Sequence, residues 1–212
     1  QERTTGNPRL MMLQIWALFF LNRLNNIDPL LEQLEDTLDI RVANSDDNAD
    51  VALALHNEIA LIRSYMARTR SAHSSAQPLA QQVLKDIDHT NIPLKSVTYY
   101  GIGLDCYANG DLASATHALE SAVAYGRREK KHATTLSSGG LLAWILFYQG
   151  EMDRALDIGT SVREWVNSYH TDPQQPRLVS CWQNSAMVQI YREKNDLTLA
   201  ETYLTPLPPH LE

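Results

Sequence analysis

The sequence predicts an all-α fold, a right-handed superhelix (α-solenoid) built from about five antiparallel helix pairs. Two observations predict it. A short turn pattern recurs along the 212-residue chain, with first positions at residues 22, 71, 110, 150 and 195. The segments on both sides of each turn carry apolar residues at helical spacing. A repeat length near 40 residues is typical of stacked helix pairs, which cannot bury their apolar faces alone.

The turn pattern itself explains why each helix pair folds back. Its clearest copies are Gly110–Ala115 and Gly150–Ala155, and Asn195–Ala200 keeps the register with Asn in place of Gly. Weaker copies begin at Asn22 and Ser71. Gly or Asn tolerates the positive φ that ends a helix. The acidic residue that follows is expected to cap the next helix.

The elements follow from these turns and from the polar or Pro-containing loops between them. We expect helices at 8–22 and 26–41, 50–70 and 74–88, 94–108 and 111–129, 132–149 and 152–169, and 176–194 and 196–205. These give repeats near 8–41, 50–88, 94–129, 132–169 and 176–205 in a single helical-repeat domain, residues 1–212, that is a fragment of a larger protein. Ala115, Ala155 and Ala200 are expected to be buried where helices cross.

Composition indicates an ordinary soluble chain with no membrane span. It is 44% hydrophobic and 20% charged, and its net charge of −7 argues against nucleic-acid binding by this fragment. The richest apolar run, 10–21, is too short to cross a bilayer and contains Gln14. Without a signal-peptide layout, a cytoplasmic location is expected. Cys106 and Cys181 are then two reduced thiols.

No catalytic or cofactor motif is found. The chain lacks a Gly-rich phosphate loop, a Gly-x-Ser-x-Gly elbow and a His-Glu-x-x-His zinc motif, and its seven His residues are scattered. We therefore expect no enzyme, no cofactor and no metal in this fragment. The basic stretch Arg127–Lys131 is read as a solvated loop, or alternatively as a surface that docks another domain or an anion.

Three stretches resemble a known family. Trp16–Leu24, Glu58–Arg68 and Tyr100–Ala115 are similar to the tetratricopeptide-like superhelix of MalT-like, LuxR-type, ATP-dependent transcriptional regulators. The resemblance covers about residues 8–205. It implies a superhelix between an N-terminal nucleotide-binding domain, where ATP is expected, and a C-terminal helix-turn-helix domain. It also implies a sensor that binds an inducer or a regulatory protein or peptide. The sensor then relays the binding signal to the neighbouring domains.

The concave face, lined by the first helix of each pair, is the expected binding surface. Turn register places aromatic and polar side chains there that could stack on a sugar or clasp a peptide. The candidate binding residues are Glu58, Tyr65, Arg68, Tyr107, Trp144, Tyr148, Gln189 and Arg192. The alternative for Trp16, Phe19, Trp144 and Phe147 is a place in the core between repeats.

Two functions from different classes stay open at this point. One is the effector-sensing domain of a transcriptional regulator, and the other is a general tetratricopeptide-type scaffold for peptides or proteins. A phosphate loop upstream and a helix-turn-helix downstream in the same gene would separate them.

Overall fold

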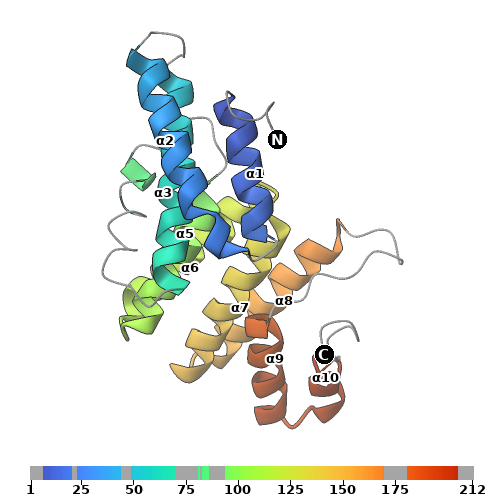
Figure 1. The fold of residues 1–212 in the computed structure, drawn as a ribbon. Coiled ribbons are helices and arrows are strands. Elements are labelled where there is room, and N and C mark those ends of the chain that lie inside the picture. Colours follow the sequence, from blue (N-terminus) through green and yellow to red (C-terminus); the bar gives the residue numbers. More distant parts are fainter. Residues whose placement is uncertain are drawn as a thin grey trace. The chain divides into compact units, whose positions relative to one another are not determined.

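The computed structural model describes residues 7–20, 23–43, 49–69, 81, 83–85, 94–169 and 181–204. Within these ranges every regular element is a helix, which confirms the all-α prediction. The chain divides into two compact units, residues 1–94 and residues 95–212, drawn from blue to red along the chain in Figure 1. The single domain expected from the sequence stays a prediction.

The first unit contains α1 (Pro8–Phe20), the 3-10 turn η1 (Leu24–Asn26), α2 (Asp28–Ala43) and α3 (Ala49–Thr69). Asn7 caps α1, because its side-chain oxygen accepts a hydrogen bond from the N–H of Arg9 at 3.0 Å. Apolar residues at helical spacing on the three helices share one core. Its buried members include Met11, Ile15, Leu31, Leu34, Leu38, Ile59 and Ile62.

The second unit contains α5 (Lys95–Ala108), α6 (Leu112–Arg128), α7 (His132–Tyr148), α8 (Met152–Asn167), α9 (Cys181–Glu193) and α10 (Leu197–Glu201). Helix α7 contacts α5, α6, α8 and α9, and is the central helix of the unit. Its sequence is apolar or small on nearly every side, as a helix with neighbours all round requires. The core around it includes Leu119, Leu141, Leu142, Ile145, Met187 and Ile190.

The three strongest turn copies have the predicted geometry. Gly110, Gly150 and Asn195 have φ angles of +78°, +82° and +57°. In each copy the next residue's N–H bonds to the carbonyl five residues earlier: Asp111 to Cys106, Glu151 to Leu146 and Asp196 to Tyr191, all at 2.9 Å. This is the hydrogen bond of a Schellman helix end. The weaker copies at Asn22 and Ser71 lie outside the described residues.

A fourth turn of the same kind links α6 to α7. Lys130 has a φ of +55°, and the N–H of Lys131 bonds to the carbonyl of Gly126 at 2.9 Å. The sequence does not reveal this turn, because Lys rarely adopts positive φ. It connects two consecutive helix pairs.

Capping differs between the copies. The side chains of Asp111 and Asp196 accept hydrogen bonds from the N–H groups of Ser114 and Leu199, each at 3.0 Å, as predicted. Glu151 makes no side-chain cap, so the expectation that every acidic residue of the pattern caps is wrong at this position. The longer Glu side chain pairs instead with Arg154.

Small residues allow close helix crossings. Ala115, Ala155 and Ala200 are buried, as predicted. A Cβ on Gly103 would lie 2.7 Å from the side chain of Leu119, which shows how tightly α5 and α6 cross. At Gly140 a Cβ would lie 2.3 Å from the backbone nitrogen of Gln183, so α7 and α9 approach backbone to backbone.

Some helix limits differ from the expected ones. Helix α2 begins at Asp28 rather than near 26, because residues 24–26 form the 3-10 turn and Pro29 favours the first helical turn. Helix α10 ends at Glu201, short of residue 205. There the Thr202 hydroxyl donates to the Leu199 carbonyl at 2.7 Å, and Tyr203 turns back into the core. Most of the expected helix 74–88, and residues 176–180, lie outside the described residues.

Candidate functional site

An aromatic surface in the second unit centres on Trp144 of α7. Its indole Nε1 donates a hydrogen bond to the Tyr107 hydroxyl on α5 at 3.2 Å. Its ring centroid lies 4.8 Å from that of Tyr148, also on α7, and 6.2 Å from that of Trp182 on α9. Tyr107 and Trp182 also meet edge to face, with centroids 5.7 Å apart. These four residues, here called the aromatic surface, join the first helices of three successive pairs.

The sequence explains why these rings come from different heights on their helices. Tyr107 lies three residues before its turn, Trp144 six before and Trp182 thirteen before. The contacts therefore run obliquely from the C-terminal end of α5 to the N-terminal end of α9. Trp182 is absent from the candidate binding residues predicted from the sequence, although its aromatic type and its position on a first helix are visible signals.

The residues of the aromatic surface pack on the core and are also partly accessible to solvent. Tyr107, Trp144 and Trp182 are half-buried and pack against the main core cluster of the second unit. Tyr148 is 63% exposed. Half-buried rings are held in position by the core below them and still offer an accessible face or edge. Such a platform suits stacking on a planar or apolar ligand group.

Gln189 and Arg192 lie further along α9. Gln189 is half-buried, and Arg192 is exposed and lies 3.5 Å from the carboxylate of Glu193. Neither residue takes part in the ring contacts around Trp144. The structure thus brings together three of the predicted residues of this unit and leaves Gln189 and Arg192 outside that group.

A second, smaller group lies in the first unit. Trp16 of α1 donates from Nε1 to the Glu58 carboxylate on α3 at 2.6 Å. Phe19 lies between Trp16 and Tyr65, with ring centroids 5.5 Å and 4.6 Å away. Tyr65 is 40% exposed. Arg68 belongs to α3, but its side chain lies outside the described part, and a surface continuous from repeat two to repeat four stays a prediction.

The electrostatic setting of the aromatic surface is mild. The contacts that form it involve uncharged groups. On the same helix as Tyr107, burial raises the pKa of the Cys106 thiol, and the nearby charges of Asp111 and Asp105 raise it further. Cys106 is buried and Cys181 exposed, and both are free thiols, as predicted.

The basic stretch Arg127–Lys131 is more structured than a solvated loop. Arg127 donates to the Ser161 hydroxyl on α8 at 2.6 Å. Arg128 lies over the Tyr125 ring, 5.6 Å from its centroid, and Lys95 lies over the same ring at 5.1 Å. Glu129 accepts a hydrogen bond from the Ser96 hydroxyl at 2.5 Å. Several of these side chains therefore hold neighbouring helices together.

Within the described ranges, no three His, Cys, Asp or Glu side chains are placed to hold a metal ion. No helix in the described part of the chain is long and apolar enough to cross a membrane.

Solved structures with the same architecture match nearly the whole chain. A putative kinesin light chain of Podosopora anserina, built of nearly identical TPR-like repeats, superposes with a TM-score of 0.58, at 17% identity, over 93% of each chain. A second crystal structure of that putative kinesin light chain gives a TM-score of 0.57 at 19% identity, over 92% of this chain and 90% of the other. The chain has a tetratricopeptide-like helical-repeat fold.

In sequence, the repeat domain is similar to part of a transcription factor. It is 23% identical over 171 residues to the HTH-type transcriptional regulator MalT of Cronobacter sakazakii (strain ATCC BAA-894). The match takes in 81% of this chain but only 18% of the regulator, so the repeat domain corresponds to less than a fifth of that protein. No family model matches the chain.

Proposed function

We propose that the repeat domain is the effector-sensing and protein-interaction domain of a MalT-like, LuxR-type transcriptional regulator. In this role it binds a small inducer or a regulatory protein or peptide in the cytoplasm. It has no catalytic function of its own. It passes the binding event to nucleotide-binding and DNA-binding domains elsewhere in the full-length protein. The similarity to MalT and the tetratricopeptide-like fold support this assignment.

One observation carries the proposal. Trp144 contacts Tyr107 on α5 and Trp182 on α9, so one half-buried ring touches first helices from the pairs before and after its own. A ligand that stacks on this group changes the contacts that set the spacing of three successive repeats. In a solenoid each repeat contacts only its neighbours, so a change in spacing alters the curvature of the whole stack.

The ligand acts through its preference for one spacing over another. It shifts the equilibrium between two forms of the repeat domain only by the difference in its affinity for them. The aromatic surface suits this task because its rings are held by a hydrogen bond and edge-to-face contacts that have discrete arrangements. Neighbouring domains that contact the repeat stack would respond to the favoured form.

A fluorescence screen tests the proposal. Trp144 and Trp182 report binding directly, so panels of oligosaccharides and short peptides are titrated while the indole emission is recorded. A ligand found in this screen is expected to bind about tenfold more weakly to Tyr148→Ala. That variant removes one exposed ring, whose stacking on the ligand contributes about 1–3 kcal/mol. Tyr169→Ala is the matched control, because Tyr169 is also exposed but lies just beyond α8. Equal losses in both variants, or none in either, would contradict the assignment of the surface.

A further inference from the structure

A groove in the second unit lies apart from the aromatic surface. It runs between α6 and α8 over α7, with a volume of about 460 Å³. Its floor and walls are apolar: Leu142 and Leu146 come from α7, Val123 from α6 and Ile158 from α8. Ala124, exposed on α6, leaves the groove open at mid-length. The volume falls within the range of small-molecule sites in proteins.

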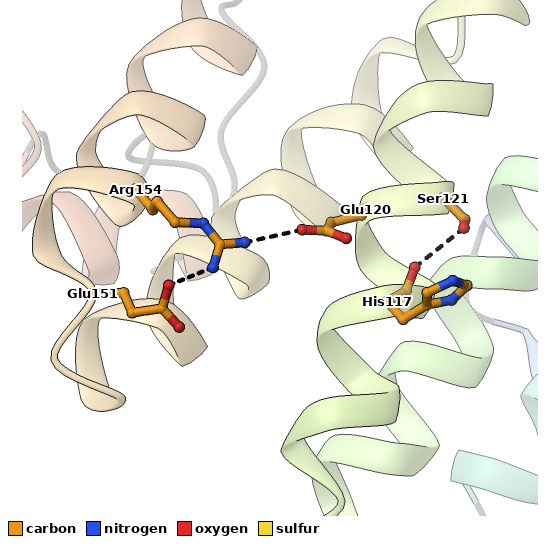
Figure 2. Close-up of polar contacts among 5 residues, drawn as sticks. All are labelled: His117, Glu120, Ser121, Glu151 and Arg154. Atoms are coloured by element: carbon orange, nitrogen blue, oxygen red, sulfur yellow. Dashed lines mark hydrogen bonds and ion pairs between the residues drawn. The ribbon is translucent and has the colours of Figure 1, made fainter.

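Two polar bridges between α6 and α8 frame this groove. At one end Arg154 on α8 donates to Glu120 on α6 at 3.1 Å, as Figure 2 shows. At the other end Arg127 on α6 donates to Ser161 on α8 at 2.6 Å. The bridges are seven residues apart on each helix, which is about 10 Å at 1.5 Å per residue. The space between them is long enough for an aliphatic chain or an aromatic ring.

The two arginines differ in how well their charges are matched. Arg154 pairs with two carboxylates, those of Glu120 and Glu151, which Figure 2 shows on either side of its guanidinium. Among the described residues, Arg127 has only the neutral Ser161 hydroxyl as a partner. Its Nε is buried and has no hydrogen-bond partner in that part of the chain, where no carboxylate lies within ion-pair distance of it either. A half-buried guanidinium without a counter-ion favours an anion beside it.

We propose that this groove binds a small amphipathic carboxylic acid. The carboxylate binds the guanidinium of Arg127, with the Ser161 hydroxyl beside it. The apolar body lies over the floor of Leu142 and Leu146. A guanidinium forms paired hydrogen bonds with a carboxylate, which a hydroxyl partner does not use up. The acidic residues Glu120 and Asp157 also line the groove, and Glu120 lies at the end opposite Arg127, which restricts the anionic group to the Arg127 end.

The test uses 4-phenylbutyrate as the probe and two-dimensional amide NMR of the repeat domain as the readout. Saturable shifts are expected in α6 and α8 around Arg127 and Ser161, with a Kd in the low millimolar range that suits a fragment of this size. The uncharged analogue 4-phenylbutanol is expected to bind about tenfold more weakly, because it lacks the charged hydrogen bonds. Equal affinity for acid and alcohol would overturn the proposal.

Two variants locate the carboxylate and one locates the apolar body. Arg127→Gln is expected to weaken 4-phenylbutyrate about tenfold. Arg128→Gln removes the same charge one residue later, where the guanidinium lies over Tyr125, and is expected to leave the Kd unchanged. Ala124→Leu keeps Arg127 but fills the groove, and is expected to block binding. Equal effects of Arg127→Gln and Arg128→Gln would show only general charge attraction and would refute the site.

A further experiment distinguishes a free carboxylic acid from a protein side chain as the ligand of the groove. The capped tripeptide acetyl-Leu-Glu-Leu-amide carries its carboxylate on a side chain between apolar groups. It is expected to bind more weakly than 4-phenylbutyrate, because its backbone does not fit between the two bridges. Tighter binding of the peptide, lost in Arg127→Gln, would assign the groove to a protein partner and overturn the small-acid proposal. If Arg127→Gln melts well below the wild type, the Ala124→Leu result decides.

Discussion

The indole Nε1 of Trp144 donates to the hydroxyl oxygen of Tyr107 at 3.2 Å, and this side-chain hydrogen bond joins the first helices of two consecutive repeats. Both side chains are half-buried. The bond therefore contributes to packing as well as to the shape of the aromatic surface.

Tyr107→Phe removes the acceptor and keeps the ring. It is expected to lower the free energy of unfolding by about 0.5–1.5 kcal/mol, since the indole N–H loses its partner. Urea denaturation followed by tryptophan fluorescence measures the change. Tyr148→Phe is the control, because the Tyr148 hydroxyl forms no hydrogen bond with the described residues, and its stability should equal that of the wild type. Equal stability of all three proteins would show that the Trp144–Tyr107 bond is not formed in solution.

Ala155→Leu tests the helix crossing after the Gly150 turn. Ala155 is fully buried, and the larger side chain would overpack its site and cost about 1–3 kcal/mol. Thermal melting measures the loss. Ala113→Leu places the same side chain at an exposed site on α6 and should melt near the wild type. A melting temperature of Ala155→Leu within error of Ala113→Leu would mean that the repeat register is wrong there.

Lys130→Gly tests the turn that the sequence conceals. Lys130 has a φ of +55°, a conformation that costs a residue with a Cβ about 1–2 kcal/mol. Gly relieves this strain, but it also loses more backbone entropy on folding than Lys does. A net stabilisation of about 0.5–1 kcal/mol is therefore expected. Lys130→Ala removes the same charge but keeps a Cβ at the positive φ, and should not be stabilised. If Lys130→Ala proves as stable as Lys130→Gly, the left-handed turn does not exist.

The cap at Asp111 predicts a dependence of stability on pH. Hydrogen bonds from the side chain and then the backbone of Ser114 lower the pKa of the Asp111 carboxyl below its ordinary value of 3.8. A lowered folded-state pKa means that this stabilisation is complete above the ordinary value and is lost as the pH falls through the folded-state pKa. Asp111→Ala should therefore be less stable than the wild type at neutral pH, and the two should converge in strong acid. A constant difference between them in urea melts across this pH range would rule out the charged cap.

Most helices and turns are predictable from the sequence because they depend on local chemistry. Gly110 and Gly150 mark positive φ, and Asp111 and Asp196 mark caps, by residue type alone. The conformation of Lys130 is not predictable in this way, because the helices on either side impose it. Glu151 does not cap because Arg154, a turn away, competes for its carboxylate.

The candidate site is only partly predictable for a different reason. The positions of Tyr107, Trp144 and Tyr148 within their repeats mark them as candidates, and the structure groups them. Trp182 completes the group because the N-terminal end of α9 meets the C-terminal end of α5, and α9 approaches α7 backbone to backbone at Gly140 and Gln183. The unmatched Arg127 likewise depends on which side chains of α8 face α6. Neither the place of Trp182 nor the lack of a counter-ion at Arg127 can be predicted from residue spacing within one repeat.

The most direct test of the central claim, that the aromatic surface receives the effector, is the transcript profile of the organism that carries the gene. Strains encoding Tyr148→Ala or Tyr169→Ala in the full-length protein are compared with the wild type and with a deletion of the gene. Tyr148→Ala is expected to reproduce the deletion profile at unchanged protein abundance, while Tyr169→Ala is expected to match the wild type. A wild-type profile in the Tyr148→Ala strain, under conditions where the deletion changes expression, would contradict it.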